Sequence, residues 1–355
     1  MISKSLARLA LRKQILLEGL KSAKVRDFLR VFDKLDTLVV DMLIAQRVPN
    51  LSDLTRGRLQ ALIGDLTNAT GELFSKATST FLNSLPEIAA YELEHEVKSL
   101  KSVASPDTEA KVKTPFESAW EDAQARPVQA AGSLLADMVE NWEAASVQRI
   151  NDAVRLGHAQ GVPTAEMVRR LLGSGRLNHQ DGTTAISKRN AATVVRTAVQ
   201  HVANSARALT WEQNSDLVLG YMFLATLDKR TSPVCRSLDQ QHFLLGKGPM
   251  PPVHANCRST TTPDLGPEFD FLRAGATRSG EDGYVNENLQ YYDFLKQQDE
   301  AYQNAVLGFT RATLFRSGGL TSERFRELQL DKNYMPITLE EMRALEPKAF
   351  KRAGL

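Results

Sequence analysis

The sequence predicts a mainly α-helical protein with a small β element, an α+β fold. Apolar residues recur at alternating intervals of three and four, which places them on one face of a helix. One segment, residues 217–227, has the composition of a strand, because it is rich in β-forming residues and too short for most buried helices. With 355 residues, 42% of them hydrophobic and 24% charged, the chain is long enough for two domains.

A long helical hairpin is expected at the N-terminus. Residues 3–47 contain no proline, and Pro49 then ends the helix because proline cannot continue the hydrogen-bond ladder. Ser52 or Asp53 can cap a second helix, which repeats the apolar spacing, so that the two helices are expected to pack as an antiparallel pair. The seam residues of the first helix are Val25, Phe28, Phe32, Leu35, Val39 and Met42, and those of the second are Leu59, Leu62, Leu66, Ala69 and Leu73.

Further helices are expected beyond the hairpin. They cover residues 87–100, a stretch after Pro127 that stops at Gly161, a short helix from Thr164, and residues 186–213. The last of these helices carries one apolar face, formed by Val195, Val199, Val202, Ala206 and Leu209.

The pattern also predicts domain boundaries. Residues 101–114 lose the apolar rhythm and collect Ser, Thr, Pro, Asp and Lys, which is typical of a linker. The tail is expected to be loop-like to about residue 288 and then helical over 289–315, with a capped helix near Thr338. We divide the chain into a helical N-terminal domain (1–104), a linker (105–114), a second domain (115–266) and a C-terminal loop and helical extension (267–355).

The charge distribution bears on the class of partner. The net charge of +2 is not that of a nucleic-acid-binding protein as a whole, but the first 30 residues hold eight basic and two acidic side chains. Lys4, Arg8 and Arg12 follow one another at intervals of four and form a stripe that could contact DNA phosphates or an acidic protein; a solvated helix face is the alternative. The sequence contains no run of about 18 apolar residues, so a membrane span is not expected. Two cysteines in a chain of this length are too few for a disulfide framework.

One segment, residues 225–263, holds both cysteines and resembles a known family. It contains Thr226-Leu227-Asp228, Val234-Cys235, Leu238-Asp239 and Phe243, followed by Pro251-Pro252, His254, Asn256-Cys257-Arg258 and Pro263. In this order the residues resemble the signature of the Mu F-like head-morphogenesis family, the minor head proteins of tailed bacteriophages. Arg196-Thr197 upstream and residues 297–320 downstream extend the resemblance over most of residues 115–345.

Three positions depart from the family pattern. Ser259 stands where a second cysteine is common after the Cys-Arg pair, Ala198 stands where a glutamate usually follows Arg-Thr, and Gln240 replaces a glycine. A role that depends on those three family side chains is not available to this protein.

The cysteines and histidines of the segment offer a metal site. Cys235, His254 and Cys257 supply three of the four positions of a tetrahedral zinc ion, and Asp228 or His242 would have to complete the shell. A disulfide between the cysteines and simple packing of two buried thiols are the alternatives.

The charged residues of the motif are interpreted as structural. Arg258 is expected to clamp Asp228 or Asp239 through charge-assisted hydrogen bonds, and Arg196 is placed in the same set. Catalysis by these groups is the alternative.

The resemblance implies a function in assembly rather than catalysis. It implies a minor head protein in the virion, inside the head near the portal, after assembly in the host cytoplasm. Its expected partners are the phage portal protein, other head proteins and packaged DNA, with a role in DNA packaging or ejection left open and no membrane contact. The rival function is a metal-dependent nuclease or another nucleic-acid-acting enzyme built on the Cys/His motif, but that chemistry needs a second metal ligand beside a general-base histidine. We expect no enzyme.

Overall fold

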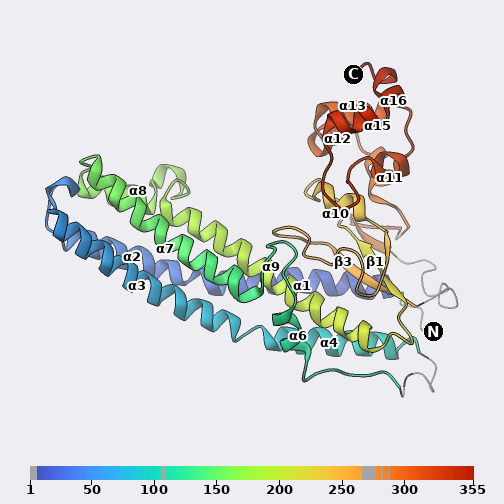
Figure 1. Ribbon diagram of the computed structural model, residues 1–355, viewed down its shortest axis with the longest axis horizontal. Helices are drawn as coiled ribbons and strands as arrows, with labels where there is room; N and C mark the ends of the chain where they lie inside the picture. The colour runs from blue at the N-terminus through green and yellow to red at the C-terminus, as the bar shows by residue number, and fades with distance from the viewer. Residues whose placement is uncertain (1–5, 105–108, 110, 266–276, 281–282, 287) are drawn as a thin grey trace.

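Long helices lie side by side in an elongated body, and a group of short helices stands at one end of it with the strands between (Figure 1). The prediction of a mainly α protein with a small β element is confirmed. The computed structural model describes the chain except residues 1–5, 105–108, 110, 266–276, 281–282 and 287. Half of the predicted linker, residues 105–108 and 110, therefore lies outside the described residues.

The N-terminal helices form the predicted hairpin. Helices α1 (Leu6–Leu29) and α2 (Val31–Ile44) follow one another in the same general direction, because Arg30 between them keeps helical backbone angles, φ −60° and ψ −21°. Helix α3 (Arg56–Leu82) runs back along them (Figure 1). Met42 of the predicted seam is partly buried, and the buried members are Val25, Phe28, Phe32, Leu35 and Val39.

The start of α3 lies later than the sequence predicts. Residues Leu51–Asp53 form a 3-10 turn (η1), which a capping box between Asn50 and Asp53 closes. Asp53 is therefore engaged before α3 begins. Thr55 caps the helix instead, and its Oγ1 accepts a hydrogen bond of 3.3 Å from the backbone N–H of Arg58.

Helix α9 is the centre of the body. It packs against α1, α4, α6, α7 and α8, and every side chain from residue 197 to residue 211 is buried. Helices from both sides of the predicted linker share one apolar core, to which α1, α3, α4, α7 and α9 all contribute. The body beyond the hairpin consists of α4 (Pro86–Lys101), α6 (Ala119–Ala125), α7 (Leu135–Ala159), α8 (Thr164–Leu172), the 3-10 turn η2 (Gly175–Leu177) and α9 (Thr183–Gln213).

Four aromatic rings fill the middle of this core. The ring centroid of Trp142 on α7 lies 5.3 Å from that of Phe28 and 5.1 Å from that of Phe74, both edge to face. Phe32 lies 5.8 Å from Phe74 and is fully buried. Edge-to-face contacts of this kind stabilise aromatic clusters beyond the area that they bury.

The strands form a three-stranded antiparallel sheet in the order β2-β1-β3. The predicted strand is present as the central β1 (Gly220–Leu224), and all five of its residues are buried. β2 (His242–Leu244) and β3 (Thr260–Asp264) are its neighbours, with Phe223 opposite Thr261.

A second sheet was not expected from the sequence. β4 (Thr277–Gly280) and β5 (Gly283–Asn286) pair as an antiparallel hairpin within the stretch that we predicted to be loop-like, so the prediction was wrong at these residues. The strands are only four residues each and lack a run of apolar residues, so their composition does not distinguish them from a loop.

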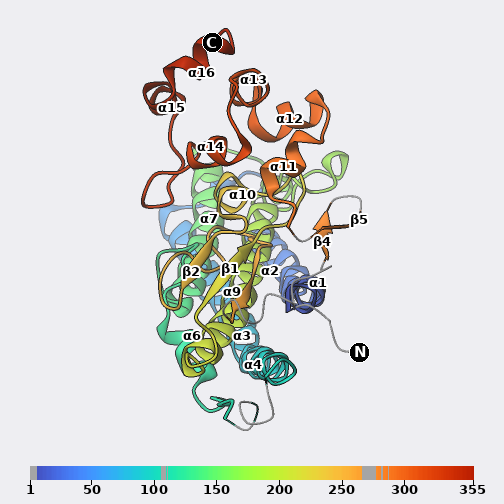
Figure 2. The same cartoon turned by 90° about the vertical axis from the view of Figure 1, so that its right-hand side faces the viewer.

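The short helices gather at one end of the molecule (Figure 2). They have a core of their own, built around Tyr292, Phe315 and Phe325. The expected helix over 289–315 is divided, because Asp299 caps a new helix and Gly308, at φ +75°, leaves the helical conformation. The elements are α11 (Tyr291–Lys296), α12 (Glu300–Leu307), α13 (Phe309–Ser317), α14 (Ser322–Glu327), α15 (Leu339–Leu345) and α16 (Pro347–Arg352). α10 (Pro233–Leu238) comes before them in the chain, and its buried residues belong to a separate cluster with Phe223. Thr338 caps α15 as predicted.

Replacement of Phe32 tests the aromatic core. We expect Phe32→Ala to lower the free energy of unfolding by about 3–5 kcal/mol, because the cavity left among Phe74 and Trp142 cannot collapse completely. Chemical denaturation measures the change. Leu156→Ala on α7, where the leucine is 55% exposed, is the control and is expected to stay within about 0.5 kcal/mol of the wild type. Equal losses in the two variants would contradict the assignment of the core.

Candidate functional site

Cys235 occupies the first turn of α10, just beyond the end of β1. Ser232 caps this helix, and its Oγ accepts a hydrogen bond of 3.2 Å from the backbone N–H of Cys235. Pro233 suits the first helical position because its missing N–H would be unpaired there in any case. The Cys235 side chain is buried.

His254 and Cys257 lie on the loop that leads into β3. This loop is fixed to α9 through Asn256, whose backbone N–H donates to Thr197 Oγ1 at 3.3 Å and whose side-chain amide donates to Thr193 Oγ1 at 3.1 Å. Asn256 has a φ of +57°, in the left-handed region that asparagine tolerates better than most residues. The bend carries Cys257 back toward α10.

The structure brings together the three residues that the sequence singled out as metal ligands. Cys235 Sγ lies 3.1 Å from His254 Nε2 and 3.7 Å from Cys257 Sγ. All three possible ligand atoms lie within 4.8 Å of one another. Both cysteines are buried and free of disulfide bonds, and His254 is half-buried. The cluster could therefore hold one metal ion.

The two thiols differ in their acidity. Hydrogen bonding from Cys235, together with the ring of His254, lowers the pKa of Cys257 well below its usual value. Burial and the neighbouring Cys257 raise the pKa of Cys235. Burial opposes charge on His254, but its contact with Cys257 outweighs burial and raises the pKa of the ring. The cluster thus favours one thiolate, which is the form that binds metals.

The residues proposed to complete the metal shell lie elsewhere. His242 is exposed on β2, and its Nδ1 lies 2.9 Å from Asp264 Oδ2. Asp228 is engaged by Arg258. Among the described residues, the set that could hold a metal ion with Cys235 consists of His254 and Cys257, and it includes neither His242 nor Asp228.

Arg258 clamps Asp228 in a two-pronged ion pair. The guanidinium Nη1 and Nη2 donate to the carboxylate at 2.6 and 2.8 Å. Burial opposes ionisation of Asp228, but the hydrogen bonds and charge of Arg258 outweigh it and lower the pKa of the carboxyl. Of the two partners that the sequence left open for Arg258, the structure thus places Asp228 against it. Arg196 is half-buried on α9.

Asp239 has a different partner, Arg278 of β4, which the sequence analysis missed. Arg278 Nη2 and Nη1 donate to the carboxylate at 2.6 and 2.9 Å, and both side chains are buried. Asp239 also accepts hydrogen bonds from the backbone N–H groups of Ala225, at 2.9 Å, and Tyr291, at 2.8 Å. This carboxylate therefore joins the end of β1 to β4 and α11.

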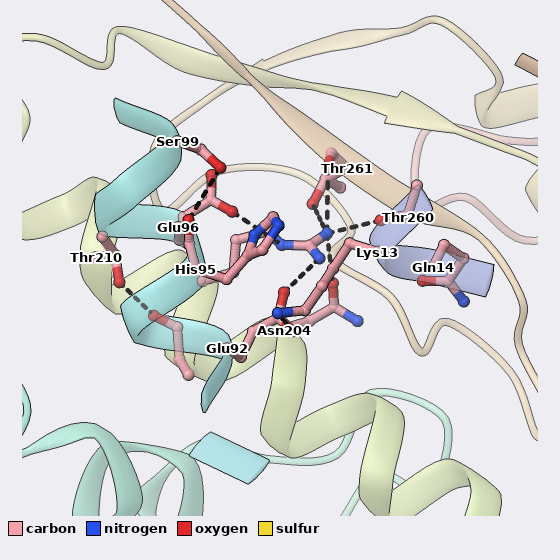
Figure 3. A network of polar contacts seen from close by, with 12 residues as sticks. Lys13, Gln14, Glu92, His95, Glu96, Ser99, Asn204, Thr210, Thr260 and Thr261 are labelled. Carbon is pink, nitrogen blue, oxygen red and sulfur yellow. Dashed lines mark hydrogen bonds and ion pairs between the residues drawn. The ribbon is translucent and has the colours of Figure 1, made fainter. Parts of the chain in front are cut away.

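A second polar network, also missed from the sequence, lies inside the helical body (Figure 3). Arg207 of α9 donates to Glu92 of α4 at 2.6 Å and to Thr260 Oγ1 of β3 at 2.6 Å. Lys13 Nζ of α1 lies 3.1 Å from Glu92, and Trp211 Nε1 donates to Glu96 at 2.7 Å. Gln200, Asn204, Arg207 and Trp211 of α9 recur at intervals of three and four, the spacing that places residues on one face of a helix. Hydrogen-bonding side chains at this spacing are the sequence signal that could have indicated the network.

Burial and the balance of charge set the pKa values of this network. Burial raises the pKa of Glu96. Burial also opposes charge on Glu92, but the neighbouring Arg207 and Lys13 outweigh it and lower the pKa of that carboxyl. His95, beside them in Figure 3, has its pKa lowered to about 4 by burial and by the charge of Lys13.

The predicted basic stripe is only partly described. Arg12 is exposed on α1, Arg8 lies on the same helix, and Lys4 lies outside the described residues. Lys13 and Lys21 of the same basic stretch are instead buried. Lys21 Nζ donates to the carbonyl of Cys257 at 3.1 Å, so α1 contacts the Cys/His loop directly.

Comparison with known protein families now places this part of the chain. Residues 148–262 match the family model of the Phage Mu protein F like protein, from within α7 to β3. The match covers about a third of the chain and includes the Cys/His cluster and the Asp228–Arg258 pair. Over this segment the chain is similar to the Mu F-like family, and the resemblance seen in the sequence is confirmed.

Other comparisons add no relatives. No curated protein and no solved structure matches the chain. None of the helices in the described part of the chain is long and apolar enough to cross a membrane.

Removal of Arg278 tests the buried pair with Asp239. We expect Arg278→Ala to lower the free energy of unfolding by about 3–5 kcal/mol, because it leaves a buried carboxylate without its counter-charge. Denaturant titration measures this loss. Arg155→Ala, which removes the exposed ion-pair partner of Asp152, is the control and is expected to change stability little. A loss for Arg278→Ala as small as for the control would show that the pair does not hold β4 in place.

The low pKa of His95 predicts a pH dependence of stability. A histidine in the unfolded chain has a pKa of about 6.5, whereas the pKa of His95 in the folded chain is about 4. Between these two pH values the unfolded state therefore binds more protons than the folded state. The neutral ring therefore contributes stability above about pH 6.5 that is lost as the pH falls toward 4. We expect His95→Gln to reduce the slope of Tm against pH in this window. A variant with the slope of the wild type would contradict the prediction.

Proposed function

We propose that the protein is a minor head protein of a tailed phage that acts at the portal vertex during head assembly. The Mu F-like match over residues 148–262 carries this proposal. Proteins of that family are phage head-morphogenesis proteins and typically structural, which supports a place in the virion and other head proteins as partners. Contact with the portal, and any part in DNA packaging or ejection, belong to the proposal.

The geometry of the motif supports an assembly role. Asp228 and Asp239 are engaged by arginines, and the loop before β3 is fixed to α9, so the motif residues hold the domain in one shape. The alternative, a metal-dependent nuclease, has less support because carboxylate ligands suited to the metals of such enzymes are absent from the described Cys/His cluster.

We place the portal contact at the sheet end of the molecule. β2 is an edge strand there, and Leu244 on it is 69% exposed. An edge strand offers unpaired backbone groups to a partner, and an exposed leucine adds apolar contact. Both features lie within the Mu F-like residues.

Packaged DNA is proposed as a secondary contact of the basic stripe formed by Lys4, Arg8 and Arg12. The exposure of Arg12 on α1 favours this. Such a contact depends on phosphate charge and should weaken steeply as salt rises.

Co-sedimentation of the full-length protein with portal rings tests the proposal. The protein is expected to bind the rings at physiological salt, and Leu244→Asp is expected to weaken binding at least tenfold, because the charge interrupts the apolar contact. Leu156→Asp is the matched control, because Leu156 is also exposed and lies within the segment that matches the Mu F-like family, but on α7 instead of the sheet. This variant is expected to bind the portal rings as the wild type does.

The outcomes separate the parts of the proposal. Loss of binding in Leu156→Asp alone would move the contact to the helical body, and no binding by the wild type would overturn the portal role. With duplex DNA as a parallel target, Arg12→Glu is expected to lower the affinity at low salt and leave portal binding unchanged. Equal DNA binding by Arg12→Glu and the wild type would remove the stripe from the proposal.

A further inference from the structure

The distances within the Cys/His cluster fit a tetrahedral metal ion. Zinc holds thiolate sulfur at about 2.3 Å, so two sulfur ligands of one tetrahedral ion are separated by about 3.8 Å. Cys235 Sγ and Cys257 Sγ lie 3.7 Å apart. His254 Nε2, at 3.1 Å from Cys235 Sγ, would need to withdraw by only about half an ångström to reach the separation of a nitrogen and a sulfur ligand.

The orientation of His254 also suits a metal ligand. Its Nδ1 lies 2.8 Å from the backbone carbonyl of Ala255, and because a carbonyl only accepts, Nδ1 carries the hydrogen. The lone pair of Nε2 in the neutral ring then points toward the sulfur atoms. A hydrogen bond from the other ring nitrogen is the arrangement that fixes histidine ligands in metal sites.

Ser259 lies next to Cys235 in the cluster. It is buried, and its hydroxyl forms a hydrogen bond with Cys235. Gln200 of α9 donates to its carbonyl at 3.2 Å, which holds the residue in place. We propose that Cys235, His254 and Cys257 bind one structural zinc ion, with its fourth position facing Ser259.

The ion would join segments that are far apart in the sequence. Cys235 belongs to α10, and Cys257 belongs to the loop that Asn256 fixes to α9. The carbonyl of Cys257 accepts the buried ammonium of Lys21 on α1. Bound zinc therefore stabilises the contact between this loop and the helical body, and this role does not depend on portal binding.

Metal analysis of the full-length, untagged protein, purified without chelator, tests the proposal. We expect about one zinc per chain by elemental analysis, and a chelator is expected to lower Tm, because metal binding is coupled to folding. Cobalt in place of zinc is expected to give the visible absorption of tetrahedral thiolate coordination. Cys257→Ser is expected to abolish both signals.

A gain of affinity provides a readout that does not depend on a destabilised variant. Ser259→Cys supplies a fourth thiolate and is expected to retain zinc against a competing chelator at least tenfold better than the wild type. Ser237→Cys is the matched control, because Ser237 is buried on α10 but contacts Tyr292 instead of the cluster, and it is expected to leave zinc retention unchanged.

Three results would overturn the proposal. Zinc-free protein with two titratable thiols after denaturation would show that the cysteines only pack. Zinc-free protein without free thiols would show a disulfide. Equal zinc retention by Ser259→Cys and Ser237→Cys would show that Ser259 does not face a metal ion.

Discussion

The ion pair between Arg207 and Glu92 is the constraint on which the helical body depends. Both side chains are buried, and a buried charge without its partner is strongly destabilising, so the backbone must keep the two groups together. Lys13 of α1 joins the same carboxylate, and Thr260 of β3 accepts from the same guanidinium. One polar cluster thus sets the positions of α1, α4, α9 and the sheet relative to one another, while the apolar seams around it supply the bulk of the burial.

The helices and the central strand were predictable because their signals are local. The spacing of the seam from Val25 to Val39 predicts a buried face, which continues from α1 into α2. The composition of residues 217–227 predicts a buried strand. The pairing of β4 with β5 was not predictable, because its short polar strands carry no local signal. The predicted helix over 289–315 is divided because Asp299 caps a new helix and Gly308 adopts a positive φ. In the sequence these two signals are weaker than the apolar spacing that predicted one continuous helix.

The candidate site was predictable in its members but not in all of its contacts. The order of Cys235, His254 and Cys257 in the motif was enough to expect them together, and the structure places them so. The partner of Arg258 was open between two aspartates until the chain path was known. Arg278 was missed because it meets Asp239 across 39 residues, from a strand that the sequence did not reveal. Pairings of this kind depend on the complete fold rather than on spacing.

The contacts of α1 have a consequence for synthesis of the chain. Gln14 meets Gln200 after 186 residues, and Lys21 meets the carbonyl of Cys257 after 236 residues. At about 5–20 residues per second, the partner of Lys21 leaves the ribosome roughly ten seconds or more after Lys21 itself. Throughout that interval the part of α1 that packs on α9 and on the Cys/His loop has no cover, so a nascent chain that stops before α9 exposes apolar surface and the Lys21 ammonium to water. The first helix made is thus among the last to reach its final place.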